Sequence, residues 1–305
     1  MSGGHGRAVL VTGATRGIGL ATARRLDDIG FRVFAGYRSD DDARRVAETG
    51  SSRITPIRLD VTDTRGITSA ADRIARETEA AGLWGLVNNA GIVVPGPLEV
   101  LPLDDIRYQF EVNTIGMVAV TQAVLPLLRR ARGRIVNVSS VNGRIAAPWS
   151  APYAASKHAL EALSDGWRVE LARWGIEVSV IEPGAIQTDI WDTSRERGLR
   201  ISGGYTPEAR TLYGGLLDRL QEVRTPARAI PPERVAARIA HALTARRPRV
   251  RYVVGWDARV ALIVKALLPA RWFDRVLGAR RRRRLAASGG RKGEPTPGPD
   301  TTPGS

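Results

Sequence analysis

Short apolar segments alternate with helix-like segments along the first 183 residues, and this alternation restricts the chain to a few folds. Seven apolar runs are strand candidates, covering residues 7–12, 31–36, 54–59, 85–89, 134–139, 177–181 and 250–254. Strands that alternate with helices form parallel sheets covered on both faces. The sequence therefore predicts a single α/β domain built on a Rossmann-type, doubly wound parallel sheet with helices on both faces.

The helix-like segments divide the rest of the chain. Apolar spacing predicts helices over residues 17–30, 70–81, 104–130, 152–174 and 231–245. The pattern loosens over residues 189–230, where we expect an irregular substrate loop. We assign residues 1–255 to the folded domain, residues 256–284 to a basic amphipathic extension with short helices at 258–268 and 271–277, and residues 285–305 to a disordered tail.

The net charge of +15 raises the question of a nucleic-acid partner. Most of the excess positive charge lies between residues 246 and 292, which contain fifteen Lys and Arg but only two acidic residues. The folded region is close to balance, so no nucleic-acid partner is expected. The chain has no cysteine, and His5, His158 and His241 lie far apart, so no metal site is predicted. No uncharged apolar run reaches the about 20 residues that span a bilayer, and a cytoplasmic location is expected.

A glycine-rich loop follows the first predicted strand and opens the first predicted helix. It runs from Thr12 to Gly19, and its glycines let the backbone turn tightly and approach a pyrophosphate. The phosphates would then lie on the unpaired N–H groups of the helix N-terminus. Glycine triplets also arise for packing reasons, but the position between a strand and a helix favours a dinucleotide site.

The end of the second predicted strand indicates which dinucleotide binds. NAD sites usually carry an acidic residue about 20 residues after the loop, which binds the ribose 2′-hydroxyl. This chain has Tyr37 and Arg38 there, and Arg16 lies within the loop. Guanidinium groups bind a 2′-phosphate, so we predict NADP(H) rather than NAD(H). A solvated Arg38, with a carboxylate of residues 40–42 on the ribose, is the alternative.

Four polar residues have the spacing of a proton-transfer site. Tyr153 and Lys157 lie four residues apart and so share one face of a helix. A nearby ammonium and the positive nicotinamide lower the pKa of a phenol from about 10, so that it can exchange a proton with an alcohol. Ser140, at the end of a predicted strand, can hydrogen-bond the substrate oxygen. Asn113 can disturb the long predicted helix locally and hold a water that relays protons from the lysine.

Together these motifs resemble the short-chain dehydrogenase/reductase family, in the group with a TGxxxGIG loop and a YxxxK pair. The resemblance covers residues 7–190 and continues weakly to about residue 255. It implies an NADP-dependent oxidoreductase acting on CH–OH groups, with Asn113, Ser140, Tyr153 and Lys157 as catalytic tetrad. The loop and the resemblance together predict these cofactor-binding residues: Gly13, Thr15, Arg16, Gly17, Ile18, Gly19, Arg38, Asp60, Val61, Asn89, Ala90, Gly91, Tyr153, Lys157, Pro183, Gly184, Ile186 (through its backbone) and Thr188.

Within the family, residues 96–99 and 153–184 resemble 17β-hydroxysteroid and retinol dehydrogenases. This implies a lipophilic, steroid- or retinoid-like substrate, or another ketone. Trp149 and Trp191 flank the predicted reaction centre, and we expect them to line the substrate pocket. The resemblance also implies a homodimer or homotetramer built on the long helices around Asn113 and Tyr153.

Two other functions compete with the enzyme. One is a catalytically silent NADP-binding sensor or scaffold on the same fold. The other is a nucleic-acid or membrane-surface protein that acts through the basic C-terminus, because an arginine run such as residues 280–284 can bind phosphates. Apolar residues just before that run permit peripheral membrane contact, with a helix packed on the domain or on a partner subunit as the simpler alternative. They are Val260, Leu262, Ile263, Val264, Leu267 and Leu268.

Overall fold

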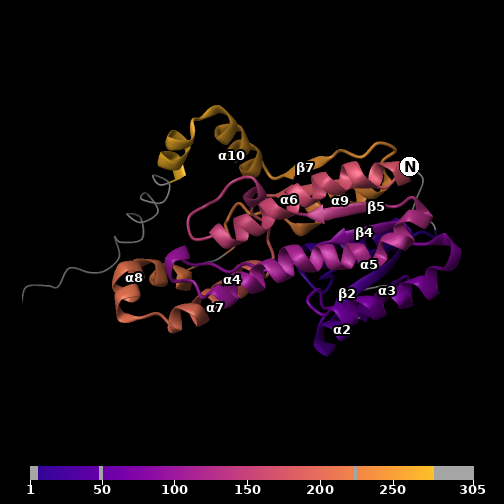
Figure 1. The fold of residues 1–305 in the computed structure, drawn as a ribbon, viewed down its shortest axis with the longest axis horizontal. Helices are drawn as coiled ribbons and strands as arrows, with labels where there is room; N and C mark the ends of the chain where they lie inside the picture. Colours follow the sequence, from indigo (N-terminus) through magenta and orange to yellow (C-terminus); the bar gives the residue numbers. More distant parts are fainter. Residues whose placement is uncertain (1–5, 48–50, 223–224, 278–305) are drawn as a thin grey trace, which may run out of the picture. The chain divides into compact units, whose positions relative to one another are not determined.

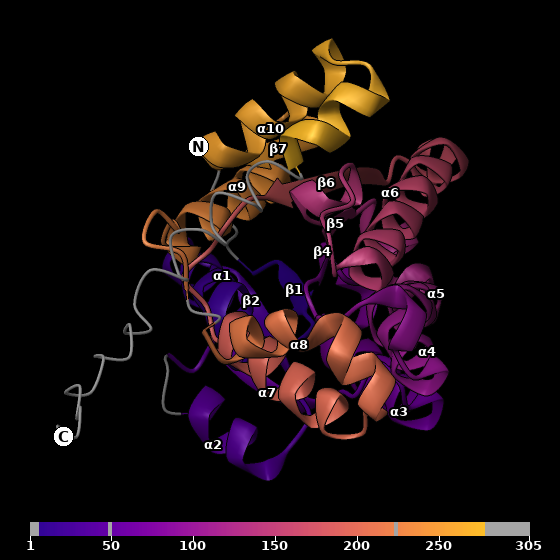
Figure 2. The same ribbon diagram turned by 90° about the vertical axis from the view of Figure 1, so that its left-hand side faces the viewer.

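The computed structural model describes residues 6–47, 51–222 and 225–277 (Figures 1 and 2). Two compact units make up the chain, residues 1–263 and residues 264–305. In the second unit, residues 270–277 are helical, as the sequence predicts for 271–277. The predicted disordered tail and the arginine run at 280–284 lie outside the described residues.

One seven-stranded parallel sheet forms the centre of the first unit. Its strands are β1 (Ala8–Val11), β2 (Arg32–Tyr37), β3 (Ile54–Arg58), β4 (Gly85–Asn88), β5 (Arg134–Val138), β6 (Glu177–Pro183) and β7 (Arg251–Val254). They are ordered β3-β2-β1-β4-β5-β6-β7, so the direction of winding reverses between β1 and β4. All seven predicted strands and the doubly wound α/β fold are confirmed.

Helices cover both faces of this sheet. The helices are α1 (Gly17–Asp28), α2 (Asp40–Ala47), α3 (Thr64–Thr78), α4 (Leu103–Phe110), α5 (Gly116–Ala131), α6 (Ala151–Leu171), α7 (Ile190–Gly203), α8 (Pro207–Glu222), α9 (Pro232–Thr244) and α10 (Trp256–Leu267). Figure 2 shows α1 and α9 on one side of the sheet and α3, α5 and α6 on the other.

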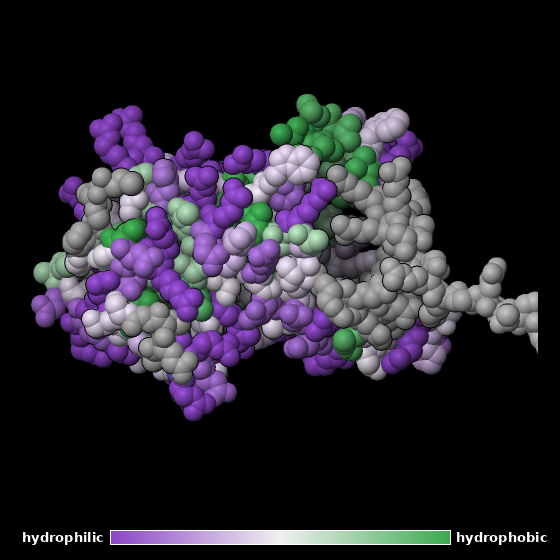
Figure 3. All heavy atoms as spheres, turned by 180° about the vertical axis from the view of Figure 1, so that it is seen from behind, coloured by the Kyte–Doolittle hydropathy of each residue, from purple (hydrophilic) through white to green (hydrophobic). Residues whose placement is uncertain are grey.

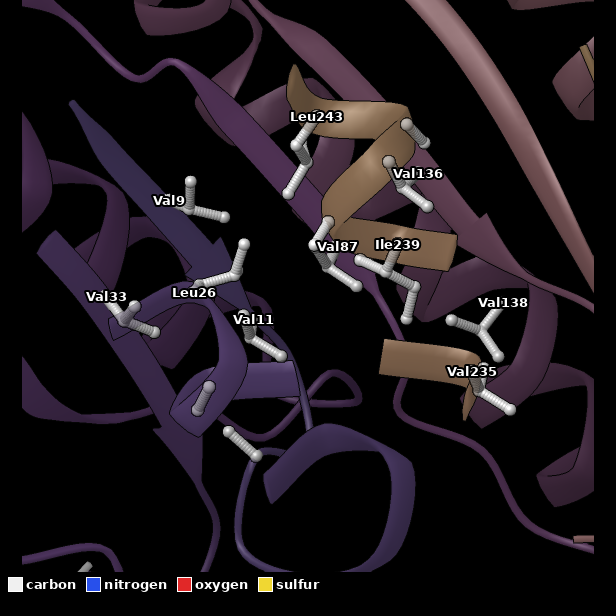
Figure 4. Packing of buried hydrophobic residues seen from close by; sticks show 14 of the residues in the cluster. Val9, Val11, Leu26, Val33, Val87, Val136, Val138, Val235, Ile239 and Leu243 are labelled. Carbon is white, nitrogen blue, oxygen red and sulfur yellow. The ribbon is translucent and has the colours of Figure 1, made fainter. Parts of the chain in front are cut away.

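Strand β1 shows why these residues form a central strand. Its side chains alternate between two buried layers: Val9 and Val11 pack with α1 and α9, whereas Ala8 and Leu10 pack with α3 and α5. All four residues are buried, as expected for a parallel strand covered on both faces. Figure 4 shows the first layer, in which Ile239 and Leu243 of α9 lie against the sheet.

The predicted helix over residues 104–130 is present but interrupted. A π-helical turn (Glu111–Ile115) joins α4 to α5 and contains Asn113, where the sequence predicts a local disturbance. In the described part of the chain, only the helical segment Leu103–Ala131 is long and apolar enough to cross a membrane. The sequence had predicted no uncharged apolar run of that length. Its most apolar window is 56% buried, and Val120, Val124 and Leu128 lie in the core. The segment is therefore interpreted as a core helix.

The expectation that residues 189–230 are irregular is wrong, whereas their role at the substrate stays a prediction. The segment forms α7 and α8, which lie beyond the carboxyl ends of the strands (Figure 1). Ile201 and Tyr205 pack against Val94 and Leu101, which are distant in sequence. These helices lack a strong apolar stripe, and contacts with residues about 100 positions earlier are invisible to local periodicity.

Helix α2 was also not expected from the sequence. Three acidic residues, Asp40, Asp41 and Asp42, fill its first turn, where negative charge favours the positive end of the helix dipole. Helix α3 begins six residues earlier than the predicted 70–81, because the Asp63 side chain accepts a hydrogen bond from the backbone N–H of Arg65 and caps it.

Candidate active site

The glycine-rich loop turns from β1 into α1 and leaves no room for larger residues. A Cβ atom on Gly19 would lie 2.1 Å from the carbonyl oxygen of Gly13 and 2.6 Å from Asn89 Nδ2. Gly13 and Gly17 have φ values of +60° and +51°, which favour glycine. Arg16, the N-cap of α1, makes no capping hydrogen bond through its side chain. The first backbone N–H groups of α1 therefore stay available to an anion, and the residues present fit a dinucleotide phosphate.

Thr12 fastens the loop to the end of β4. Its hydroxyl oxygen accepts hydrogen bonds from the backbone N–H groups of Asn89 (2.9 Å) and Ala90 (3.0 Å). The Asn89 side chain returns hydrogen bonds of 2.9 Å to the carbonyls of Thr12 and Gly13. The predicted loop and the predicted Asn89–Gly91 segment are thus brought together. The structural role of Thr12 was missed, although its place directly before Gly13 pointed to it.

The cation positions predicted for the adenosine end are both at the surface. Arg38 is exposed directly after β2. The Arg16 guanidinium lies 3.5 Å from the carboxylate of Asp42, so part of its charge is already balanced. Asp60 accepts hydrogen bonds from the backbone and the hydroxyl of Thr62 at 2.9 and 2.8 Å and so fixes the turn after β3. Val61, next in the chain, packs in the core layer between the sheet and helices α3 and α5.

The segment after β6 lies beside the glycine-rich loop. A Cβ atom on Gly17 would lie 2.9 Å from Thr188 Cγ2, which places this segment beside the glycine loop. The carboxylate of Asp257 accepts a hydrogen bond of 2.9 Å from Ala185 N–H, and a Cβ atom on Gly184 would lie 2.4 Å from it. Asp257 was not identified from the sequence, because it lies 72 residues further along the chain.

Tyr153, Lys157 and Ser140 meet where α6 packs on the end of β5. Lys157 Nζ lies 5.9 Å from the centre of the Tyr153 ring and donates a hydrogen bond of 2.8 Å to the carbonyl of Val138. The lysine side chain is buried. Ser140 caps a short 3-10 turn (Val141–Gly143) by accepting a hydrogen bond of 3.1 Å from Asn142 N–H. Three of the four predicted catalytic residues are therefore adjacent.

The protonation of this group follows from its removal from water. Burial raises the pKa of the Tyr153 phenol, and its hydrogen bond with Ser140 opposes that rise. Burial lowers the pKa of Lys157 to about 8, and the negative charge of Glu161 opposes that fall. The protein alone thus keeps Tyr153 neutral. The lowering of its pKa by Lys157 and the nicotinamide stays a prediction for the cofactor complex.

Asn113 lies beside the lysine, but its side chain is fully engaged. Its amide oxygen accepts a hydrogen bond of 2.8 Å from Ile92 N–H, and its amide nitrogen donates to the Ile92 carbonyl (3.0 Å) and to Ser156 (3.1 Å). A Cβ atom on Gly91 would lie 3.4 Å from Asn113 Oδ1 and 3.6 Å from Lys157 Nζ. Asn113 therefore holds the Ile92 backbone and Ser156 in place, and its binding of a relay water stays a prediction.

The two tryptophans predicted at the substrate occupy different positions. Trp191 donates an indole hydrogen bond of 2.8 Å to the carbonyl of Ile186, in the segment after β6. Trp149 has a φ of +63°, and its carbonyl accepts a hydrogen bond of 3.0 Å from Gly96 N–H. A positive φ is costly for a large side chain and is found most often at functional sites.

No group of three or more His, Cys, Asp or Glu side chains suited to a metal ion occurs among residues 6–47, 51–222 and 225–277.

Comparison with known proteins assigns the class that this fold and site define. The sequence pattern of the family described as short chain dehydrogenase matches residues 7–198, and the chain belongs to this family of oxidoreductases. It is 39% identical to human retinol dehydrogenase 5 over 277 residues, which cover 88% of this chain and 87% of that protein. It is 37% identical to human 17-beta-hydroxysteroid dehydrogenase type 6 over 281 residues, with the same coverage.

Solved structures agree with this assignment. A short chain dehydrogenase from Burkholderia cenocepacia J2315, in complex with NADP, superposes with a TM-score of 0.69 at 27% identity and covers 90% of this chain and 97% of its own. A short chain dehydrogenase/reductase from Burkholderia phymatum, in complex with NAD, gives a TM-score of 0.72 at 23% identity, covers 88% of this chain and 96% of its own, and supports the fold alone.

Proposed function

We propose that this protein interconverts an alcohol and a ketone or aldehyde by hydride transfer with NADP(H), on a lipophilic, steroid- or retinoid-like substrate. The observation that carries the proposal is the convergence of Ser140, Tyr153 and Lys157 beside the glycine loop and the segment that follows β6. An intact proton-transfer group beside a dinucleotide cradle favours an enzyme over a silent sensor or scaffold.

The protein's own groups handle the proton and the charge. When bound, the nicotinamide ring would donate or accept the hydride. In reduction the neutral Tyr153 phenol donates its proton to the carbonyl oxygen, while Ser140 stabilises the charge on that oxygen. In oxidation Tyr153 must accept the alcohol proton, and the ammonium of Lys157 stabilises the resulting phenolate. Lys157 would also hold the nicotinamide ribose.

Replacing Tyr153 by Phe should abolish turnover and leave NADP(H) binding nearly unchanged, because only the acid–base proton is lost. Lys157→Ala should weaken both, since the lysine serves the tyrosine and the ribose. Steady-state kinetics and cofactor titration calorimetry measure the two effects, with Tyr108→Phe on α4 as the matched control. Substantial turnover in Tyr153→Phe would contradict the mechanism, and wild-type protein that binds NADPH without any turnover would favour the sensor.

The preference for NADP(H) rests on the positive charge at the adenosine end. The last residue of β2 is Tyr37 rather than the acidic residue that is usual in NAD sites. Arg38 follows it and is exposed at the surface. A fixed guanidinium gives a 2′-phosphate a charge-assisted hydrogen bond, whereas a 2′-hydroxyl gains little from it. The Burkholderia cenocepacia relative is a complex with NADP. Asp42, which pairs with Arg16, is the residue that would favour NAD(H) instead.

Arg38→Ala should weaken NADPH binding by about tenfold or more, because a lost charge-assisted contact costs about 1.5–3 kcal/mol. NADH binding should change little, and Arg24→Ala on α1 should change neither. Dissociation constants measured for both cofactors test this. Equal losses for the two cofactors, or a wild-type preference for NADH, would contradict the assignment.

A lipophilic substrate is supported by the relatives and by the residues near Tyr153. The similar proteins include retinol dehydrogenases and 17-beta-hydroxysteroid dehydrogenases, whose names give flat, apolar substrates. Trp149 lies four residues before Tyr153, and Trp191 lies three residues after Thr188. Helices α7 and α8 lie beyond the strand ends, where the sequence predicted a loop. We assign these two tryptophans to the walls of the substrate pocket.

Trp149→Ala and Trp191→Ala should raise the Michaelis constants for retinoid or steroid substrates about tenfold, because each removes a large apolar contact. The constant for NADPH should change less. Trp174→Ala, in the short 3-10 turn (Ala172–Trp174) that follows α6, is the control. Unaltered Michaelis constants in both variants across a ketone panel would remove the two tryptophans from the pocket.

A homodimer or homotetramer would use the long helices. Exposed apolar side chains lie along α4, the π-helical turn and α6, at Leu103, Ile115, Leu163 and Val169. Such side chains are expected at an interface between copies rather than facing water.

Peripheral membrane contact is a second proposal, and it rests on α10. Trp256, Val260 and Ile263 have the spacing of one helix face, and Trp256 and Ile263 are 71% and 57% exposed, while Ala258 on the opposite face is buried. Figure 3 shows hydrophobic side chains gathered over this helix, bordered by hydrophilic ones. A groove of about 490 Å³ beside it is basic, lined by Arg238, His241, Arg249, Arg251, Tyr252, Val253 and Arg259. An apolar face with arginine flanks suits an anionic lipid surface.

A double variant, Trp256→Ser and Ile263→Ser, should float with phosphatidylserine-containing vesicles about tenfold less than the wild type. Leu212→Ser, at a residue of α8 that is 67% exposed, is the matched control. Equal flotation of all three proteins would contradict contact through α10.

A further inference from the structure

Two buried carboxyl groups lie behind Lys157, and the mechanism above does not use them. Glu161 follows the lysine by one turn of α6 and is 7% exposed. Glu182 is the penultimate residue of β6, directly before Pro183, and is 0% exposed. Carboxylates are rarely buried without partners, because removal from water disfavours their charged form. This pair therefore needs a physical explanation.

One guanidinium supports most of the negative charge. Arg251 Nε, on β7, lies 3.2 Å from Glu161 and 3.2 Å from Glu182, and its Nη2 lies 2.7 Å from Asp165. A second arginine, Arg144, approaches Glu182 only at 3.5 Å. Asp165 also pairs with Arg168, so Arg251 and, at the longer distance, Arg144 are the cations nearest to the two buried glutamates.

The hydrogen bonding of the pair is incomplete. Within the described part of the chain, neither oxygen of Glu182 nor Oε1 of Glu161 receives a well-aligned hydrogen bond. Glu161 Oε2 accepts one, from Arg251. Burial and the neighbouring charge of Glu161 raise the pKa of Glu182, whereas Arg144 and Arg251 act to lower it. Glu161 is the better supported carboxylate of the two.

The groups that face Lys157 come from three elements. Tyr153 and Glu161 lie on the same helix, Val138 offers its carbonyl from β5, and Asn113 lies on the π-helical turn. Glu182, on β6, lies beside Glu161. The groups that face Glu161 from other elements are Arg251 on β7, Glu182 on β6 and the hydroxyl of Ser139. Asp165, one turn further along α6, shares Arg251 and also pairs with Arg168, and Arg144 pairs with Glu182. Among the described residues, Glu161 supplies the negative charge that favours the ammonium form of Lys157.

We propose that Glu161 is a positioning residue whose carboxylate keeps Lys157 in the ammonium form, while the adjacent Glu182 carries a proton. A protonated Glu182 removes the repulsion between the two acids and leaves Arg251 to pair with Glu161 and, together with Arg168, with Asp165. Glu161 then acts on Tyr153 through the lysine. Only this last catalytic consequence rests on the proposed function.

The expected change at neutral pH follows from the direction of each effect. A carboxylate near an amine favours the protonated amine, so loss of the Glu161 charge lowers the pKa of Lys157 further below its wild-type value of about 8. The neutral amine would then predominate near neutral pH, and the phenolate of Tyr153 would lose its stabilising charge. The ascending limb of the pH profile of alcohol oxidation, which needs deprotonated Tyr153, should therefore move to higher pH.

Lysine titration tests the proposal without cofactor or substrate. The chain has only three lysines, Lys157, Lys265 and Lys292, so ¹³Cε- and ¹⁵Nζ-labelled lysine gives few NMR signals to assign. Lys157 should titrate near pH 8 in the wild type. Its proton affinity should fall about tenfold or more in Glu161→Gln and recover in part in Glu161→Asp. Asp165→Asn, one turn further along α6, is the matched control and should leave the Lys157 titration in place.

The variant Glu182→Gln tests whether Glu182 carries the proton. Glutamine resembles a protonated glutamate, so the Lys157 titration should stay within the wild-type range if Glu182 is neutral. A fall as large as that of Glu161→Gln would contradict a neutral Glu182. Titration of Lys157 at the wild-type pH in Glu161→Gln, or an equal fall in Asp165→Asn, would overturn the role of Glu161. If Glu161→Gln does not fold, Glu161→Asp decides: no shift at all would contradict the proposal.

Activity measurements distinguish a failure of the proposed function from a failure of the role assigned to Glu161. The pH profile of alcohol oxidation should shift upward by about one unit in Glu161→Gln and not in Asp165→Asn. A wild-type protein without turnover would refute the proposed function, yet the NMR titrations would still decide the role of Glu161. A shifted lysine titration with an unshifted activity profile would overturn the link through Lys157 to Tyr153.

Discussion

The hydrogen bond from the buried ammonium of Lys157 to the carbonyl of Val138 is the contact on which the site depends. It joins α6 to the end of β5, so that Tyr153, one turn earlier, lies beside Ser140. The same contact brings Glu161, one turn later, to Glu182 and Arg251. A charge in such a place requires compensation, because burial disfavours it, and the negative charge of Glu161 acts in that direction.

A second constraint is steric and acts at the cofactor end. The approach of Gly19 to Gly13 and Asn89 leaves no space for a side chain, and Thr12 fastens the loop to β4. Backbone N–H groups of α1 are therefore held at the carboxyl edge of the sheet, where the winding reverses between β1 and β4. Both ends of the site meet at this edge because parallel strands present their carboxyl ends together.

The strands, the interruption of the long helix and the proximity of Ser140, Tyr153 and Lys157 could be predicted from the sequence. Strands buried on both faces, such as β1, read as continuous apolar runs, and the i, i+4 spacing of Tyr153 and Lys157 is a local signal. Helices α7 and α8 could not be predicted, since they are held by contacts with Val94 and Leu101 rather than by their own periodicity. Asp257 and Arg251 act across 70 or more residues, and no local pattern points to them.

Hydride transfer is the central claim, and an isotope experiment tests it most directly. The purified protein is incubated with NADPH carrying deuterium at C4 of the nicotinamide and with panels of retinal, steroid ketones and simple ketones. We predict deuterium on the carbinol carbon of at least one product, and none when Tyr153→Phe replaces the wild type. NADPH that binds tightly while no label reaches any carbonyl compound, in either Tyr153 form, would contradict the account.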